Sequence, residues 1–291
     1  MFEGSIVAIV TPFKNGEVDE AKLKELLEFH IRNGTNGIVP CGTTGESPTL
    51  SHEEHERVID VTVETIAGRI AVIAGTGSNS TAEALRLTKH AKKAGADGAL
   101  LITPYYNRPT QKGLYEHYMK IADTVDIPMI IYNVPSRTGT DILPETLAKL
   151  AEHKNIIGVK EATGLLKRSS EIVEACGKEF ILLSGDDVVT LPMMSVGGKG
   201  VISVVANIAP AEVSAMCNAA KAGDFQKAQE LHYKTLPLSI DLFIETNPIP
   251  VKTAMKLMGM LNGEMRLPLS SMTESNLAKL AATLKYCGLI S

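Results

Sequence analysis

The sequence has no tryptophan, few aromatic residues (4%) and only four cysteines among its 291 residues. The cysteines are scattered and include no Cys-x-x-Cys pair, which argues against both a disulfide framework and a zinc ribbon. No apolar run approaches the roughly 18 residues that indicate a membrane span. The first residues lack the basic region of a signal peptide. We therefore expect a cytoplasmic protein with reduced thiols and no membrane partner.

The sequence also has no strong excess of either charge. Its formal net charge is −4, and it contains no basic cluster of the kind that grips phosphates, so a nucleic-acid partner is not expected. An apolar content of 44% and a charged content of 21% are ordinary for a soluble globular protein. The length suits one large barrel-type domain or two ordinary domains, with a substantial core in either case.

Strand-like and helix-like stretches alternate through residues 1–222. Helical periodicity after Ser51 begins with a capping box, because Glu54 follows three residues later. Short apolar runs predict strands near 5–10, 37–40, 70–74, 98–102, 128–132, 155–160, 180–184 and 200–204. Patterns with helical spacing predict helices near 19–31, from 51 onward, and near 81–94, 114–125, 144–153, 166–176, 188–196 and 210–222.

Eight strand–helix units predict a closed TIM (β/α)8 barrel in residues 1–222. An open doubly wound sheet is the alternative, although such a sheet usually has fewer strands. Residues 223–291 contain helical patterns only, and we expect them to form a C-terminal helical extension packed on the barrel. Because barrel active sites lie at the C-terminal ends of the strands, functional side chains are expected to gather there.

Lys160 stands at the end of the sixth predicted strand. Lysine is rarely buried unless it is paired or used in chemistry. Burial disfavours the ammonium form, and the free amine can then attack a carbonyl carbon to form a Schiff base. The alternative is a strand-end lysine that extends its amine to solvent.

Other strand ends also carry polar groups. In Gly42-Thr43-Thr44-Gly45-Glu46, two glycines bracket two hydroxyl residues, so backbone N–H groups can turn inward and hold a carboxylate; an ordinary loop is the alternative. Tyr132 can pass protons through its hydroxyl, and Arg137 can form a bidentate pair with a carboxylate. Their alternatives are a tyrosine at the barrel rim and a solvated arginine. Together the four features predict an anion nest, a phenol, a guanidinium and a buried amine at one mouth.

His52 and His55 lie on one face of a predicted helix. They could form part of a metal site, but no clear third ligand accompanies them, so no metal site is predicted.

Several motifs resemble one known family. They are Gly42-Thr43-Thr44-Gly45-Glu46, Tyr132-Asn133-Val134-Pro135-Ser136-Arg137-Thr138-Gly139, Gly158-Val159-Lys160-Glu161-Ala162 and Leu183-Ser184-Gly185-Asp186-Asp187. Their combination resembles the dihydrodipicolinate synthase family, which belongs to the class I pyruvate-dependent aldolase and lyase barrels. The resemblance extends from Val7 to the C-terminal helices, including Asn247-Pro248-Ile249-Pro250-Val251-Lys252.

The resemblance implies a reaction. Lys160 would condense with pyruvate, and the resulting enamine would attack L-aspartate 4-semialdehyde. The product would be 4-hydroxy-tetrahydrodipicolinate, in the diaminopimelate route to lysine. The imine would need neither a metal nor pyridoxal phosphate. The family is usually homotetrameric, as a dimer of dimers.

The resemblance also implies roles for single residues. Tyr132, Thr44 and Tyr106 would form a proton relay, with Tyr106 reaching in from a neighbouring subunit. The backbone groups of Thr43 and Thr44 would hold the pyruvate carboxylate, and Arg137 would meet the semialdehyde carboxylate. Two further positions would line the substrate pocket, Gly185 and Ile202.

A second site is implied by similarity to lysine-inhibited family members, in which matching positions form a feedback site for L-lysine at the tight-dimer interface. Glu83 would pair with the ligand ammonium, while Asn79 and Tyr105 would meet its α-amino and carboxylate ends. Pro48 departs from the smaller residue expected in many members, which puts the affinity in doubt. The whole set is Ser47, Pro48, Leu50, His52, His55, Asn79, Glu83 and Tyr105.

Two other functions compete with this one. A sister lyase on the same scaffold would cleave N-acetylneuraminate or a 2-keto-3-deoxy sugar acid. Arg137 within Ser-Arg-Thr-Gly favours a small aldehyde with a carboxylate over such polyols. A silent barrel would only bind an amino or keto acid, but it would have no need of Lys160 together with Tyr132 and Thr44.

Overall fold

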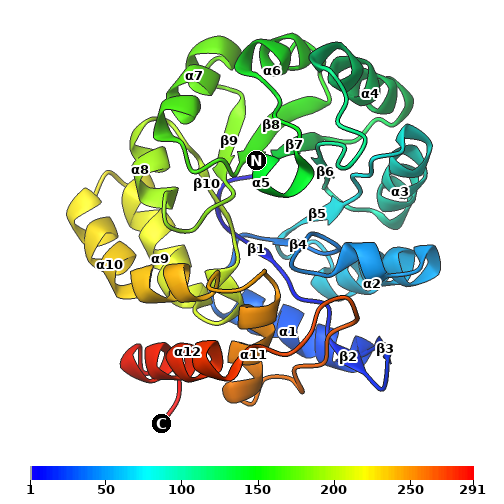
Figure 1. Ribbon diagram of the computed structural model, residues 1–291. Helices are drawn as coiled ribbons and strands as arrows, with labels where there is room; N and C mark the ends of the chain where they lie inside the picture. Colours follow the sequence, from blue (N-terminus) through cyan, green and yellow to red (C-terminus); the bar gives the residue numbers. More distant parts are fainter. Residues whose placement is uncertain (1) are drawn as a thin grey trace.

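The computed structural model describes residues 2–291. Its centre is a closed barrel of eight parallel strands, hydrogen-bonded in the order β1-β10-β9-β8-β7-β6-β5-β4 (Figure 1). The predicted TIM barrel is therefore confirmed, and the doubly wound alternative is wrong. The barrel strands are β1 (Gly4–Ala8), β4 (Gly37–Val39), β5 (Ala71–Gly75), β6 (Gly98–Ile102), β7 (Met129–Asn133), β8 (Ile156–Glu161), β9 (Ile181–Ser184) and β10 (Gly200–Ser203).

A helix follows each strand and packs on the outside of the barrel (Figure 1). The predicted capping box is present at the start of α2: the Ser51 N–H donates to Glu54, and the Glu54 N–H donates to the Ser51 hydroxyl. No helix in the described part of the chain combines the length and hydropathy that a membrane crossing requires. The outer helices are α1 (Glu20–Arg32), α2 (His52–Ile66), α3 (Thr81–Ala94), α4 (Gln111–Thr124), α6 (Pro144–Leu150), α7 (Leu166–Cys176), α8 (Thr190–Ser195) and α9 (Pro210–Lys221).

Five short elements were not predicted from the pattern. They are too short for a periodicity of two or of 3.6 residues to repeat. They comprise a hairpin of β2 (Phe13–Lys14) and β3 (Glu17–Val18), the one-turn helix α5 (Pro135–Thr138), and the 3₁₀ turns η1 (Ser47–Thr49) and η2 (Val205–Asn207).

The barrel interior is filled by side chains from alternate positions along each strand. Ile130 and Tyr132 of β7 both belong to this interior cluster. Phe2 belongs to it as well, and a Cβ added at Gly98 would lie 2.8 Å from its ring. Because Tyr132 pairs with Lys160 in the β7–β8 register, both side chains lie in one layer at the C-terminal ends of their strands.

The C-terminal residues form the predicted helical extension, with α10 (Phe225–Asp241), α11 (Ile249–Leu257) and α12 (Glu274–Tyr286). Figure 1 shows α12 beside α11, and the two helices pack against each other. Met255 of α11 and Leu284 of α12 belong to the same buried cluster as Leu27 of α1 and Ile59 of α2. One continuous core includes side chains from both sides of residue 222. The division of the chain into a barrel (1–222) and an extension (223–291) stays a prediction.

Candidate active site

Lys160 is the last but one residue of β8, inside the barrel mouth, and only 6% of its surface is exposed. Its Nζ lies 4.1 Å from the centroid of the Tyr132 ring. Burial lowers the pKa of Lys160 to about 7; the Asp187 carboxylate opposes this shift, and the positive charge of Arg137 adds to it. A substantial fraction of this side chain is therefore a free amine at neutral pH, which is the form that attacks a carbonyl.

Tyr132 contacts Lys160 from the neighbouring strand. Burial raises the pKa of its phenol, while the charge of Arg137 and the Thr43 side chain act in the opposite direction. The phenol therefore keeps its proton at neutral pH. A protonated hydroxyl can donate one hydrogen bond and accept others, as a proton-transfer group must.

Asp187 was not recognised from the sequence as a partner of Lys160. Its buried carboxylate accepts hydrogen bonds from the N–H groups of Val204 and Val205 at 2.9 and 3.2 Å, and from the Ser203 hydroxyl. Burial raises the pKa of Asp187, and these donors oppose that rise. The carboxylate is thereby fixed where its charge acts on the Lys160 amine.

The loop Gly42–Glu46 follows β4 and has the turned backbone expected of an anion nest. The Gly45 N–H donates to the Gly42 carbonyl, and the Glu46 N–H donates to the Thr43 carbonyl, both at 3.1 Å. Within residues 2–291, the N–H groups of Thr43 and Thr44 have no hydrogen-bond acceptor. Two free donors at the mouth of the barrel are suited to a carboxylate.

Asn247 connects two of the predicted site residues and was not predicted itself. Its side-chain nitrogen donates to the Thr44 hydroxyl at 3.0 Å, and its carbonyl accepts from Arg137 Nη2 at 3.2 Å. In the described part of the chain, its side-chain oxygen is buried without a hydrogen-bond partner. Because 203 residues separate Asn247 from Thr44, no local pattern indicates that the two side chains meet. The one signal in the sequence was the family motif that begins at Asn247.

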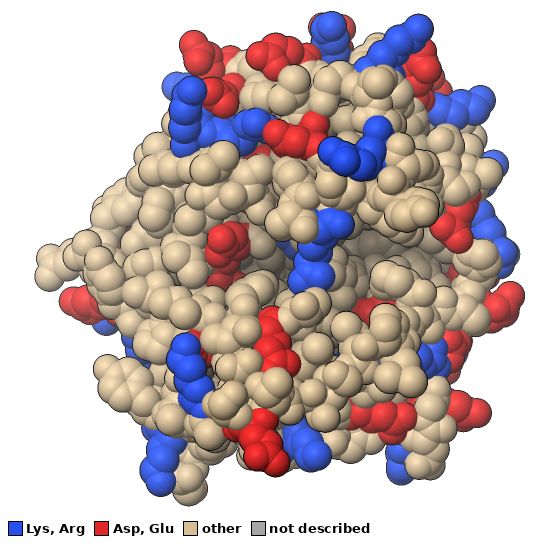
Figure 2. Space-filling model, viewed as in Figure 1, with Lys and Arg blue, Asp and Glu red and all other residues tan. Residues whose placement is uncertain are grey.

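The candidate site is a cavity of about 380 Å³ at the C-terminal mouth of the barrel. Figure 2 shows a hollow in the centre of this face, with basic and acidic side chains at its rim. Residues that were predicted for the site and line the cavity are Thr43, Thr44, Tyr132, Arg137, Lys160 and Gly185. The α10–α11 region adds Ser239, Ile240, Phe243 and Asn247, which the sequence did not indicate.

Gly185 and Ile202 are the remaining predicted pocket positions. A Cβ at Gly185 would lie 2.6 Å from the Ala162 Cβ and 3.1 Å from the Lys160 Cε, so only glycine fits beside the lysine stem. Ile202 lies on β10 and is buried in the same interior cluster as Tyr132. Its contact with a substrate stays a prediction.

Tyr106 is not brought to Lys160 within this chain. It is 92% exposed, with a backbone φ of +70°, in the loop between β6 and α4. A non-glycine residue with positive φ is uncommon, and an exposed large aromatic ring is informative as well. This chain presents Tyr106 outward, toward whatever lies beside it.

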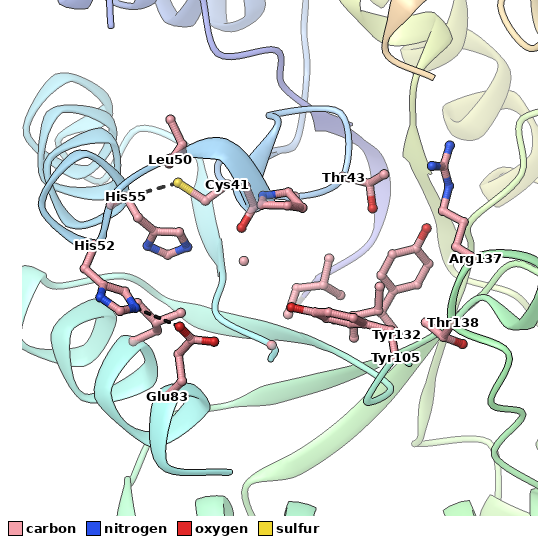
Figure 3. Close-up of a pocket in the computed structure, with 18 residues that line it drawn as sticks. Cys41, Thr43, Leu50, His52, His55, Glu83, Tyr105, Tyr132, Arg137 and Thr138 are labelled. Atoms are coloured by element: carbon pink, nitrogen blue, oxygen red, sulfur yellow. Dashed lines mark hydrogen bonds and ion pairs between the residues drawn. The ribbon is translucent and has the colours of Figure 1, made fainter. Parts of the chain in front are cut away.

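A second cavity, of about 370 Å³, adjoins the first, and Figure 3 shows Glu83 and His52 at one end with Thr43 and Arg137 at the other. Asn79 does not line it, but its side chain donates to the Tyr105 carbonyl at 3.1 Å. The other predicted lysine-site residues do line it: Ser47, Pro48, Leu50, His52, His55, Glu83 and Tyr105.

The charges in this second cavity are well defined. Arg86 can only donate, so Nδ1 of His52 accepts from it, and the opposite nitrogen, Nε2, donates to Glu83 at 2.7 Å. Hydrogen bonds from Ser78 and His52 lower the pKa of Glu83, which keeps it ionised. Burial lowers the pKa of His55 to about 4, so its ring is neutral at pH 7. The Glu83 end of the cavity therefore presents an ionised carboxylate beside the neutral ring of His55, while the Arg137 guanidinium lies at the other end. Within the described residues, no group of three His, Cys, Asp or Glu is placed to hold a metal ion.

The barrel and this mouth together define a class of protein: TIM barrels that hold a near-neutral lysine amine beside a phenol, as the class I aldolase and lyase barrels do. A profile of the Dihydrodipicolinate synthetase family matches residues 1–287. The chain belongs to this family.

Relatives agree over the full length. The 4-hydroxy-tetrahydrodipicolinate synthase of Geotalea uraniireducens is 61% identical over 290 residues, covering 100% of both chains. A solved chloride-inhibited dihydrodipicolinate synthase from Acinetobacter baumannii, complexed with pyruvate, has a TM-score of 0.98 and 50% identity, with 100% of both chains covered. The enzyme from Cyanidioschyzon merolae, with lysine bound, has a TM-score of 0.96 and 41% identity, with 99% of both chains covered.

Proposed function

We propose that this chain condenses pyruvate with L-aspartate 4-semialdehyde to give 4-hydroxy-tetrahydrodipicolinate, in the diaminopimelate route to lysine. The observation that carries the proposal is the buried Lys160, whose pKa is lowered to about 7 and whose amine lies against the Tyr132 ring. Full-length similarity to a synthase of that name, and to a solved synthase complexed with pyruvate, supports it.

The first half of the reaction activates pyruvate. The Lys160 amine attacks the ketone carbon, and loss of water leaves an imine between Nζ and that carbon. The imine withdraws electrons, so a proton leaves the methyl group and an enamine forms. In this proposal the imine supplies the electron sink that a metal or pyridoxal phosphate supplies in other enzymes, and neither cofactor is needed.

The second half forms two bonds. The enamine carbon attacks the aldehyde carbon of the semialdehyde, and the aldehyde oxygen takes up a proton to become a hydroxyl. The amino group of the same substrate then attacks the former ketone carbon. The bond from that carbon to Lys160 breaks, which closes the ring and returns the lysine as a free amine.

Proton transfers accompany every step, and we assign them to Tyr132, Thr44 and Tyr106. The ring contact between Tyr132 and Lys160 and the burial of Thr44 support the first two assignments. Tyr106 is 92% exposed and lines neither cavity of its own chain, so we assign its action to the site of another copy of the chain. We therefore propose that Tyr106 is exchanged between two subunits of a dimer, and the resemblance to a family that is usually tetrameric extends the proposal to a homotetramer built from two such dimers.

The carboxylates of the two substrates need separate partners. We assign the pyruvate carboxylate to the free N–H groups of Thr43 and Thr44. The semialdehyde carboxylate is assigned to Arg137, whose guanidinium lines the same cavity and can form a bidentate pair. Gly185 and the Ile202 carbonyl complete the substrate pocket.

L-Lysine is proposed as an inhibitor that occupies the second cavity. The ionised Glu83 would pair with a ligand ammonium, and neutral His55 would not repel it. Similarity to the lysine-bound Cyanidioschyzon merolae enzyme supports this assignment. Pro48 lines the cavity, so its ring sets the space available to the ligand. Unchanged turnover in millimolar lysine would contradict the assignment.

The proposed location is the cytoplasm. Each of the four cysteines is a free thiol in the structure, the state that a reducing compartment maintains.

The test of the reaction is a coupled assay. Purified protein receives pyruvate and aspartate semialdehyde, and the product is consumed by a reductase that oxidises a nicotinamide cofactor. We expect turnover with wild type and with the surface variant Lys221→Ala, and none with Lys160→Ala. Release of pyruvate from N-acetylneuraminate or 2-keto-3-deoxygluconate, without turnover of the semialdehyde, would instead identify a sister lyase.

A further inference from the structure

A buried ion pair joins the C-terminal extension to the loop of the anion nest. Glu46 ends the Gly42–Glu46 loop, and its carboxylate pairs with the ammonium of Lys252 on α11. Both side chains are 0% exposed. No step of the proposed reaction uses either residue.

Further contacts hold the same two groups. The second Glu46 oxygen, Oε2, accepts a hydrogen bond from the backbone N–H of Arg266 at 3.1 Å. Lys252 Nζ also donates to the Glu264 carbonyl at 2.9 Å and lies 4.3 Å from the centroid of the Phe13 ring. The Glu46 carboxylate thus has charged and neutral donors, and the ammonium has a carboxylate, a carbonyl and an aromatic face.

The pair has a direct consequence for the backbone of the nest. Glu46 adopts a φ of +55°, a left-handed conformation that is uncommon for a residue with a side chain. It stands two residues after Thr44, and its own N–H donates to the Thr43 carbonyl at 3.1 Å. The direction of the Thr43 and Thr44 N–H groups therefore depends on the conformation that the buried pair holds at Glu46.

Stability alone is a weak reason to bury such a pair. Removing two charges from water is costly, and replacing a buried ion pair by uncharged side chains of similar volume is often neutral or stabilising. A buried pair beside a binding loop is better explained by the geometry that it imposes on the loop.

We infer that Glu46 and Lys252 are positioning residues, which set the Thr43–Thr44 backbone to receive the pyruvate carboxylate. The inference rests on the proposed function, because it assigns that carboxylate to the nest. A carboxylate bound equally in the ground state and the transition state affects KM and leaves kcat almost unchanged. Loss of the pair should therefore appear as a KM effect for pyruvate.

The experiment compares Lys252→Met with the double variant Glu46→Gln/Lys252→Met. The single variant leaves a buried carboxylate unpaired, so its Tm should fall sharply. The double variant removes both charges, and its Tm should return toward that of wild type. Its KM for pyruvate should nevertheless stay raised by about tenfold to a hundredfold, since small displacements of positioning groups have effects of that order. Its KM for the semialdehyde and its kcat should change little.

A matched control is available on α10. Lys227 and Glu230 form an exposed ion pair at 2.9 Å, and Glu230→Gln/Lys227→Met should leave both the Tm and the KM for pyruvate unchanged. If the buried double variant recovers its Tm and also shows a wild-type KM for pyruvate, the pair only stabilises the fold and the inference is wrong.

Glu46→Asp tests the inference without removing a charge. The carboxylate is shortened by one methylene, so either the loop moves toward Lys252 or the contact lengthens. We expect a raised KM for pyruvate, and a wild-type KM in this variant would overturn the inference even if the double variant does not fold. Failure of the proposed function is distinguishable from either result, because wild type itself would then show no turnover of pyruvate and semialdehyde.

Discussion

At the scale of single residues, the proposed chemistry depends on the groups that surround Lys160. Burial favours its neutral amine, the Asp187 charge favours its ammonium, and Arg137 opposes the ammonium again. The net effect places the pKa at about 7, compared with about 10.4 for an exposed lysine. Near neutral pH, the neutral amine and the ammonium form of Lys160 are therefore both populated.

This balance predicts the pH dependence of imine formation. The amine is the reactive form, so the rate of reaction with pyruvate should rise with pH and level off above about 7. Asp187→Asn removes the charge that favours the ammonium, and its midpoint should move to lower pH. The measurement is the initial rate of borohydride-trapped adduct across pH 5 to 9. A rate that still rises steeply at pH 9, as expected for a free lysine, would contradict the burial argument.

Gly185 offers a second test at this scale. Gly185→Ala places a Cβ 3.1 Å from Lys160 Cε and 2.6 Å from the Ala162 Cβ, so the lysine stem must shift. We expect kcat to fall by up to about a hundredfold, because misplacing a reactive group by about 1 Å has effects of this order. Gly113→Ala, in helix α4, is the control and should keep wild-type kcat. Wild-type kcat in Gly185→Ala would mean that the lysine has more room than the structure indicates.

At the scale of elements, adjacent strand ends and the loops after them assemble the site. The β7–β8 register sets Tyr132 beside Lys160, while α5 carries Arg137 and the β4 loop carries the nest. Helix α2 begins directly after η1, next to the nest, and its capping box satisfies backbone groups at that start. The start of α2 therefore contributes to stability, while the strand ends and the loops after them, including α5, contribute the proposed chemistry.

A change in the α2 cap should separate these two roles. Ser51→Ala removes the side-chain acceptor of the Glu54 N–H, and we expect the free energy of unfolding to fall by about 1 kcal/mol. Denaturant titration measures this change, and the yield of the pyruvate adduct should not change. A loss of adduct formation at wild-type stability would show that this helix start takes part in the chemistry.

Much of the site could be predicted from sequence because each part is local. An apolar run that ends in lysine, or two hydroxyl residues between glycines, is visible within ten residues. Contacts between distant segments have no such pattern. Nothing near Asn247 or Lys252 indicates that they meet Thr44 and Glu46, about 200 residues earlier. Likewise, the position of Asp187 opposite Lys160 depends on how β8 and β9 close within the barrel.

At the scale of the whole molecule, the barrel and its extension pack together around one core. In the proposed mechanism, the site at the barrel mouth lacks one relay residue, which another copy of the chain supplies. The second cavity adjoins the first, and the exposed Tyr106 ring lines neither of them. An exposed aromatic ring next to an open cavity is suited to contact with another copy of the chain. The proposed exchange of Tyr106 would complete the relay and would also cover the second cavity.

Subunit exchange can be tested by complementation. Lys160→Ala lacks the proposed nucleophile, and Tyr106→Phe lacks the proposed relay hydroxyl, so each protein alone should have little activity. In mixed oligomers, a site with intact Lys160 can receive Tyr106 from the other variant, and activity should recover. Mixing after unfolding and refolding together, followed by the coupled assay, measures the recovery. No recovery in verified mixed oligomers would show that Tyr106 does not act between subunits.

The central claim is that Lys160 forms the covalent imine, and mass spectrometry tests it most directly. Protein is incubated with pyruvate, reduced with borohydride, digested and analysed for a pyruvyl adduct. The account predicts one stable adduct on the peptide that contains Lys160, and none in Lys160→Ala treated in the same way. An unmodified wild-type Lys160 peptide would contradict the account, and a barrel that only binds amino or keto acids would become the leading explanation.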